Sequence, residues 1–133
     1  MSTTTAELAA AARIGCSWCV DFGYWVSTRK GIDPAKLRDV PRWRDSEVYT
    51  DLERRVLEYA EAATATPPAV TDEMVADLRR HLDDAALVEL TMMIAVENQR
   101  SRFNTALGLT SQGFKDRCEI PVRPAHTSAA RAS

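Results

Sequence analysis

The stretch AELAAAARIGCSWCVDFGYWVSTRK, residues 6–30, carries the pattern that decides the fold class. Its apolar positions recur mostly every three or four residues, which is typical of a helix with one buried face. Gly15 interrupts this pattern, and we expect it to divide the stretch into two helices, with Cys16 just inside the second. Gly31 follows the stretch and is expected to cap the C-terminal end of that second helix.

Further helix signals follow along the chain. Thr50 followed by Glu53 is a capping-box pattern that predicts the start of a helix, and Thr71 is expected to cap the next one. A long helix begins at Asp83 or Asp84, and its apolar positions are Leu87, Leu90, Ile94, Phe103 and Leu107. Residues 32–46 contain two prolines and are expected to form a short helical turn and a loop, with Trp43 folded back onto the body. No segment alternates with period two, so the sequence predicts an all-α fold.

The length of 133 residues corresponds to one domain. We expect a helical domain over residues 1–109 and a C-terminal extension over residues 110–133 that is partly disordered. The long helix is apolar around nearly its whole circumference at residues 90–96. A helix of this kind needs cover on all sides, so the sequence predicts contacts between subunits.

The composition excludes several classes of partner. Lys and Arg total 17 against 19 Asp and Glu, a formal net charge of −2. Proteins that bind nucleic acid or an anionic membrane carry a basic surplus, so neither partner is expected. We find no stretch of about 20 apolar residues and no signal-peptide pattern at the start, so a cytoplasmic location is expected.

Two of the three cysteines, Cys16 and Cys19, form a Cys-x-x-Cys motif. In a helix the two side chains share one face about one turn apart, so their sulfurs can close a disulfide. A helix N-terminus also lowers the pKa of a cysteine from about 8.5 by favouring the thiolate. The alternative is that both are small buried apolar residues.

A zinc site is a further alternative for the pair, but it needs four ligands. The other candidate ligands are Cys118, His81 and His126, and their spacing fits no zinc ribbon or finger. No metal is therefore expected.

Aromatic residues surround the cysteine motif. Trp18, Phe22 and Trp25 could form an apolar pocket that admits an organic hydroperoxide, or they could be ordinary core residues. On the long helix, Glu89 and Glu97 are expected to pair structurally with nearby arginines, because a buried carboxylate needs a partner.

The sequence GCSWCVDF at residues 15–22 resembles the Gly-Cys-x-Tyr/Trp-Cys core of the carboxymuconolactone decarboxylase family, in its alkylhydroperoxidase D-like branch. The resemblance continues through LEYAEA at residues 57–62 with TATP at 64–67, and through VELT at 88–91 with RFNTALG at 102–108. It covers roughly residues 8–109. The resemblance implies an all-helical subunit, an alkylhydroperoxidase D-like bundle, that assembles into homotrimers or homohexamers.

The resemblance also implies the roles of the motif residues. Cys19 would attack the peroxide and pass through a sulfenic acid, and Cys16 would donate a proton and resolve the product into a disulfide. Related proteins carry a His four residues after the second cysteine, where this chain has Gly23, and a Glu where it has Thr4. Glu7, one turn closer to the motif, is the candidate replacement. Most of the helical segment that precedes the motif in the family has no counterpart in residues 1–15; either this branch has lost it or the given sequence begins too late.

These observations together predict a thiol-dependent peroxidase that uses the cysteine pair and no metal, flavin or haem. A hydroperoxide or another small molecule would be its substrate, and a thioredoxin-like protein would reduce it. One alternative is a non-catalytic oligomeric binding or scaffold protein of the same fold. The other, less favoured, is lactone decarboxylation, which needs a polar acid–base pocket where the motif offers aromatic neighbours.

Overall fold

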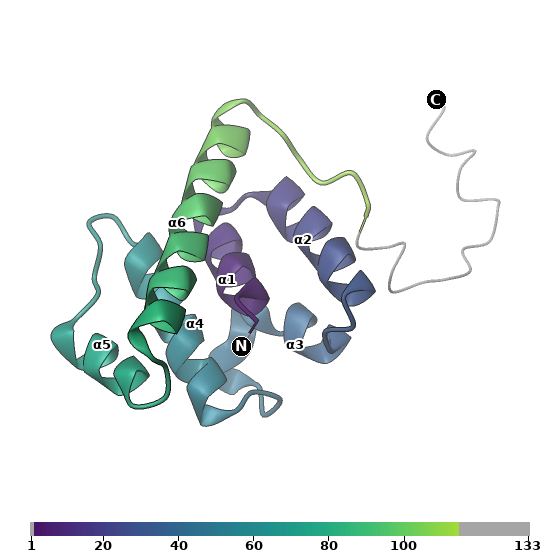
Figure 1. Ribbon diagram of the computed structural model, residues 1–133. Helices are drawn as coiled ribbons and strands as arrows, with labels where there is room; N and C mark the ends of the chain where they lie inside the picture. Colours follow the sequence, from purple (N-terminus) through teal and green to yellow (C-terminus); the bar gives the residue numbers. More distant parts are fainter. Residues whose placement is uncertain (1, 115–133) are drawn as a thin grey trace, which may run out of the picture.

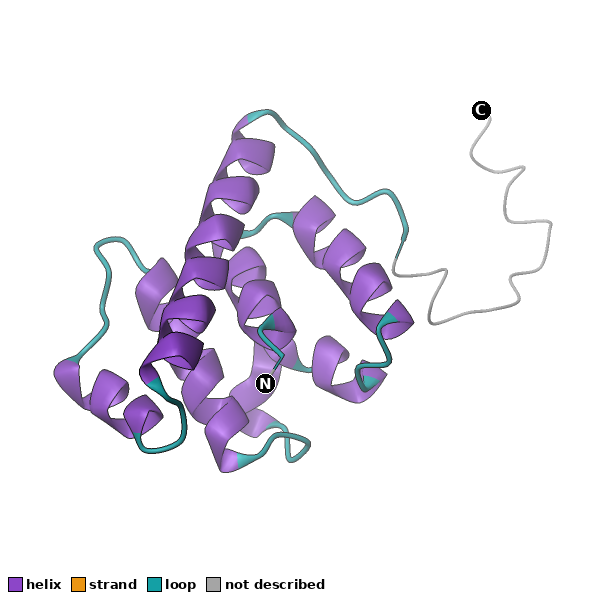
Figure 2. Cartoon of the chain, viewed as in Figure 1, coloured by secondary structure: helices purple, strands orange, loops and turns teal. Residues whose placement is uncertain are grey.

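The computed structural model describes residues 2–114, and every regular element in this range is a helix (Figure 2). The described part of the chain contains six α-helices and one 3₁₀-helix, so the all-α prediction is confirmed. Cys118, His126 and the part of the predicted extension from residue 115 onward lie outside the described residues. The elements are α1 (Thr4–Ile14), α2 (Ser17–Arg29), α3 (Pro34–Arg38), η1 (Val40–Asp45), α4 (Asp51–Thr64), α5 (Asp72–Arg79) and α6 (Asp84–Ala106).

The polar residues before the helices act as the predicted caps. Thr50 and Glu53 form the complete capping box at the start of α4, each side chain bonding the other's backbone N–H. Thr71 and Asp83 each accept a hydrogen bond from the backbone N–H three residues further on, at the starts of α5 and α6. The predicted helix starts are therefore confirmed.

Gly15 separates α1 from α2, as predicted. Its φ of +88° lies in the left-handed region, which a residue with a Cβ adopts only with strain. The backbone N–H of Gly15 bonds the carbonyl of Ala11, which ends α1, and the chain turns at once into α2. Cys16 is thus the N-cap of α2, one position before the helical residues in which the sequence had placed it.

Helix α1 lies at the centre of the molecule. It packs against α6, α4, α2 and η1, with α5 on the far side of α4 and α6 (Figure 1). The alanines of α1 that face its neighbours are fully buried, and their small side chains let the surrounding helices approach closely. These residues are Ala6, Ala9, Ala10 and Ala11.

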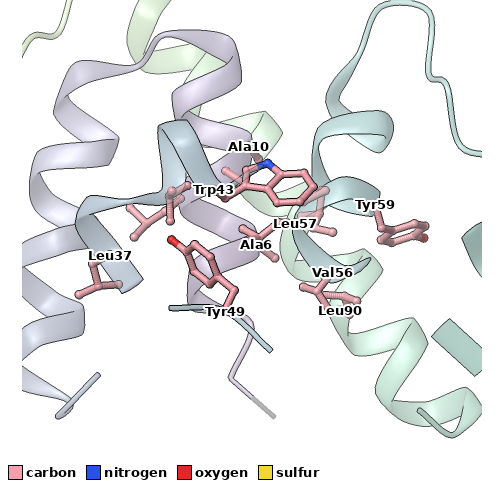
Figure 3. Close-up of a cluster of buried hydrophobic side chains, with 14 of the residues drawn as sticks. Ala6, Ala10, Leu37, Trp43, Tyr49, Val56, Leu57, Tyr59 and Leu90 are labelled. Atoms are coloured by element: carbon pink, nitrogen blue, oxygen red, sulfur yellow. The ribbon is translucent and has the colours of Figure 1, made fainter. Parts of the chain in front are cut away.

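One hydrophobic cluster joins these helices (Figure 3). Leu57 from α4 and Leu90 from α6 are completely buried in it, and Tyr24 brings in α2. Trp43 of η1 folds back onto the body of the protein, where its Nε1–H donates to the Glu61 carboxylate at 2.9 Å. The segment that the sequence predicted as a turn and loop therefore contributes to the core.

Helix α6 has a buried face that is only partly apolar and an exposed face that carries large apolar residues. Its buried positions follow one another at steps of four and three residues, and their character changes from apolar to polar along the helix. They are Leu90, Ile94, Glu97 and Ser101, followed by the half-buried Asn104. The large apolar residues Val88, Met92, Phe103 and Leu107 are instead 61% to 68% exposed. Phe103 and Leu107, which the sequence analysis named as apolar positions, lie outside the buried stripe, because polar side chains occupy it at that end.

A helix that crosses a membrane needs about 20 predominantly apolar residues. Within residues 2–114, no helix is both long enough and apolar enough to span one.

Candidate functional site

The two cysteines of the motif are joined by a disulfide at the N-terminus of α2. Their Cα atoms are 5.3 Å apart, within the ordinary range for this bond. The Cys16 sulfur also acts as the N-cap acceptor, since the backbone N–H of Cys19 donates to it at 3.2 Å. The predicted pairing of the two sulfurs across one helical turn is present in the structure.

Both cysteines are buried, yet each borders a cavity. Cys16 is 1% exposed and Cys19 is 7% exposed, and they pack with Ala11, Trp18 and Val20. A cavity of about 280 Å³ touches Cys19, and another of about 330 Å³ touches Cys16. A different cavity therefore borders each of the two cysteines of the disulfide.

The cavity beside Cys19 has one apolar and one polar side. Helices α1, α2 and α6 supply its lining residues, and Glu7, one of the predicted site residues, is among them. The other lining residues are Thr4, Leu8, Ala11, Trp18, Phe22, Gly23, Val26, Ser27, Lys30, Glu97 and Arg100. Gly23 and Thr4 therefore line the same cavity as Cys19. These are the two positions at which related proteins are expected to carry the His and Glu that relay a proton.

No histidine is among the described residues that line this cavity. The side chain of Leu8 occupies the space beside Gly23, because a Cβ placed on Gly23 would lie 2.9 Å from Leu8 Cδ2. A side chain at position 23 would therefore require Leu8 to move. The described His81 lies exposed between α5 and α6, not in this cavity.

A charged cluster forms the polar side of the cavity. Arg100 donates to the carboxylates of Glu7 at 2.9 Å and Glu97 at 2.7 Å. Ser101 donates to the other oxygen of Glu97 at 2.7 Å, and Thr3 donates to Glu7 at 2.9 Å. Burial opposes the charge on Arg100, but the hydrogen bond and charge of Glu97, with those of Glu7, outweigh it and raise the pKa of the guanidinium.

These contacts settle the structural role predicted for Glu97, which is buried and ion-paired. Glu89, which the sequence treated in the same way, is exposed. Arg102 donates to the backbone carbonyl of Thr64 at 3.2 Å instead of pairing with a carboxylate. The surroundings of the motif are also more polar than its aromatic sequence neighbours suggested. Glu97 and Arg100 lie far from the motif in sequence, but α6 places them at the same cavity.

The aromatic residues near the motif are half-buried and packed on one another. Trp18 stacks on Phe22 with ring centres 4.9 Å apart, and both line the cavity. Trp25 does not line it. It packs against Phe22 and Phe114, and the guanidinium of Arg29 lies 4.2 Å from its ring centre. Two of the three predicted pocket residues therefore border the space beside Cys19.

The cavity beside Cys16 lies under the chain that follows α6. Buried Asp21 accepts hydrogen bonds from the backbone N–H groups of Gln112 at 3.1 Å and Phe114 at 2.9 Å. Ser17 accepts another from the N–H of Ser111 at 3.1 Å. The first residues of the predicted extension are thereby held against α2.

Sequence reasoning missed one direct contact with the motif. Asn104, near the end of α6, donates from Nδ2 to the sulfur of Cys19 at 3.4 Å. A signal for this contact exists in the sequence, since Glu97, Ser101 and Asn104 continue the spacing of Leu90 and Ile94. Polar residues that continue a buried stripe are expected to meet a polar or reactive partner.

A protein site for a metal ion needs several ligating side chains close together. Within residues 2–114, no three side chains of His, Cys, Asp or Glu gather closely enough to hold a metal ion.

Comparison with known sequences gives matches over much of this chain. Residues 5–62 match the carboxymuconolactone decarboxylase family. The uncharacterized protein YnjA of Escherichia coli (strain K12) is 42% identical over 108 residues, which are 81% of this chain and 58% of YnjA. The uncharacterized protein YdfG of Bacillus subtilis (strain 168) is 27% identical over 95 residues, which are 71% of this chain and 65% of YdfG. The chain thus spans about three-fifths of these relatives.

Solved structures share the fold. ATU0492 of Agrobacterium tumefaciens, a protein of unknown function described as a candidate antioxidant defence protein AhpD, superposes with a TM-score of 0.76 at 27% identity, covering 81% of this chain and 75% of its own. The debrominase Bmp8 superposes with a TM-score of 0.77 at 21% identity, covering 87% of this chain and 62% of its own. The fold is therefore AhpD-like.

The charged cluster leads to a prediction about stability. Replacing Arg100 by Met leaves the buried Glu97 carboxylate without its cation, and we expect a loss of about 1–3 kcal/mol in the free energy of unfolding. Adding Glu97→Gln to Arg100→Met removes the unpaired charge and should recover part of that loss. Urea unfolding at pH 7 measures both effects. Arg13→Met, at an exposed position on α1, is the control, and an equal effect of the two arginine substitutions would contradict the prediction.

Proposed function

Through residues 5–62 the chain belongs to the carboxymuconolactone decarboxylase family, and from this premise we propose that it is a thiol-dependent peroxidase. The observation that carries the proposal is the Cys16–Cys19 pair at a helix N-terminus, with Cys19 bordering a cavity. The description of ATU0492 as a candidate antioxidant defence protein supports the same class of reaction.

The proposed reaction begins from the reduced pair. The Cys19 thiolate attacks one oxygen of the hydroperoxide, an S–O bond forms, the O–O bond breaks, and the departing alkoxide takes the proton of the Cys16 thiol to become an alcohol. The Cys16 thiolate then attacks the sulfenic acid on Cys19 and forms the disulfide, and the departing hydroxide takes the proton that Glu7 removed from the Cys19 thiol to become water. Two thiol groups of an external donor reduce the disulfide again, and we propose a thioredoxin-like protein as that donor.

Local structure supports a thiolate at this position. Cys19 is the third residue of α2, a helix of 13 residues, so the helix dipole acts on its sulfur. A negative charge in the first turn of a helix is favoured, which lowers the pKa of a thiol there. The helix N-terminus can therefore favour the Cys19 thiolate in the reduced protein without help from a histidine.

Glu7 is the proposed proton acceptor. Its carboxylate lines the cavity that Cys19 borders, whereas the two usual relay positions hold Gly23 and Thr4. Thr3 and Arg100 hold the Glu7 side chain in place. We assign to Glu7 the part that a Glu–His pair plays in the related proteins.

A second candidate function is that of a non-catalytic binding or scaffold protein. The observation that favours it is the burial of both sulfurs, since structural cysteines in apolar surroundings are inert. Measurement of turnover separates the two functions directly.

The proposed activity depends on Cys19. We expect Cys19→Ser to abolish thiol-dependent consumption of cumene hydroperoxide with dithiothreitol as reductant, because no thiolate remains to attack the peroxide. Glu7→Gln should lower the rate by about 10²-fold, the lower end of the range for general base catalysis. The control is Cys118→Ser, which should retain the parent rate. Equal rates for the parent and Cys19→Ser would eliminate the peroxidase.

The stacked rings of Trp18 and Phe22 suggest that the substrate is a bulky organic hydroperoxide. We expect Trp18→Ala to lower kcat/KM for cumene hydroperoxide about 10-fold relative to hydrogen peroxide, because the apolar wall contacts only the larger substrate. Trp25→Ala is the matched control. Trp25 packs against Phe22 but does not line the cavity, so this variant should leave the ratio of the two kcat/KM values unchanged. If both variants change the ratio equally, this assignment of the wall is wrong.

The exposed apolar face of α6 supports the proposal of a homotrimer or homohexamer. Val88, Met92, Phe103 and Leu107 form the face, and a second copy of the chain is its proposed cover. Sedimentation should give a mass about three or six times the 14.8 kDa of one chain. Met92→Glu should reduce that mass, whereas Glu89→Gln on the same helix should not. A parent chain that sediments as a monomer at micromolar concentration would refute the assembly.

A further inference from the structure

The side chain of Asn104 gives the Cys19 sulfur a hydrogen-bond donor that comes from outside the cysteine motif. Its Nδ2–H group lies 3.4 Å from Cys19 Sγ, across a separation of 85 residues. We propose that Asn104 is a catalytic residue of the redox centre, which stabilises negative charge on Cys19 and thereby makes Cys19, and not Cys16, the attacking sulfur. This inference rests on the proposed function and deepens it.

The fold fixes the position of Asn104. Helix α6 crosses α1 and reaches α2 with its C-terminal turns (Figure 1). Arg102 ties that end of α6 to the carbonyl of Thr64, and the backbone carbonyl of Asn104 accepts from the N–H of Leu109 at 3.0 Å. Asn104 is half-buried on the face of α6 that continues from Ser101. The amide is thus held against Cys19 by a packed helix, not by a loop.

The two sulfurs of the pair have different donors. Cys16 Sγ accepts the backbone N–H of Cys19 at 3.2 Å, a bond that follows from its N-cap position. Cys19 Sγ accepts only the side-chain N–H of Asn104 among the hydrogen bonds of the described residues. Without Asn104, the backbone donor would favour the thiolate on Cys16. Cys16 is the more deeply buried of the two and does not border the aromatic cavity, the one that Trp18, Phe22 and Cys19 line.

The donor does not obstruct the sulfur that it contacts. Asn104 is not among the residues that line either cavity, so the approach to Cys19 through the aromatic cavity is left open. An amide donates a hydrogen bond without adding a charge or a titrating group. It therefore stabilises a thiolate over the whole range of pH at which the thiol ionises.

The charged groups near Cys19 do not replace this contribution. Glu7 on α1, Lys30 at the C-cap of α2, and Glu97 and Arg100 on α6 line its cavity. Two carboxylates and two cations balance there, and Arg100 is held by both carboxylates. The buried carboxylate of Asp21 on α2 borders the Cys16 cavity instead, where it opposes negative charge.

The first experiment measures the Cys19 thiolate without any peroxide. In a Cys16→Ser, Cys118→Ser background, Cys19 is the remaining thiol of the chain. The rate of alkylation by iodoacetamide is followed against pH in the reduced protein. The pH at which this rate reaches half its maximum reports the pKa of the Cys19 thiol, and we call it the midpoint. We expect Asn104→Ala to raise the midpoint by about one pH unit, the effect of losing one hydrogen bond to a charged group. Asn104→Asp, which has nearly the same shape, should raise it further because its carboxylate repels the thiolate.

The matched control is Asn98→Ala. Asn98 lies on the same helix but bonds Thr64 and the Ile94 carbonyl, so its removal should leave the midpoint unchanged. A second measurement retains Cys16 in the Cys118→Ser protein. Limiting iodoacetamide followed by mass spectrometry should show a ratio of Cys19 to Cys16 labelling that falls at least about threefold in Asn104→Ala.

Equal midpoints in the parent, Asn104→Ala and Asn104→Asp would overturn the role of Asn104, whether or not the parent consumes peroxide. An Asn104-dependent midpoint in a protein that consumes no peroxide would refute the proposed function and leave this assignment intact. Thermal melting of each variant confirms that the folded protein is compared.

Discussion

The docking of α6 across α1 is the contact on which the rest of the structure depends. The small side chains of α1, such as Ala6 and Ala10, let α6 approach closely enough for Leu90 to be fully buried. The same approach brings Arg100 to the Glu7 carboxylate and Asn104 to the Cys19 sulfur. Packing of the core and assembly of the candidate site are therefore consequences of one helix crossing.

A second constraint acts on the sulfurs themselves. Burial of the Cys16–Cys19 pair disfavours the thiolate on which the proposed reactivity depends. In the proposed reaction, the start of α2 and the amide of Asn104 offset this effect of burial on the Cys19 thiolate. The proposed reaction therefore uses a Cys19 thiolate in a site where Gly23 stands at the position of the histidine expected from the family.

Local features of the sequence predicted most of the secondary structure. Gly15 ends α1, and Thr50 and Thr71 cap their helices, because each of these effects involves backbone groups only a few residues away. The same local features did not show which apolar residues of α6 are buried, and Phe103 and Leu107 are exposed. Hydrophobic periodicity predicts a buried face only when apolar residues occupy it, and on this helix they lie on both faces.

The sequence by itself determined that the chain is helical and that two cysteines share one turn, because both properties arise from spacings of three and four residues. Only the tertiary structure decided what surrounds the sulfurs. Asn104 lies 85 residues from Cys19, and Arg100 lies 93 residues from Glu7. The spacing on α6 indicates that Asn104 needs a polar partner, but no local pattern identifies a partner at such a separation. These contacts depend on which faces of α1, α2 and α6 pack together, and that choice is made by burial over the whole molecule.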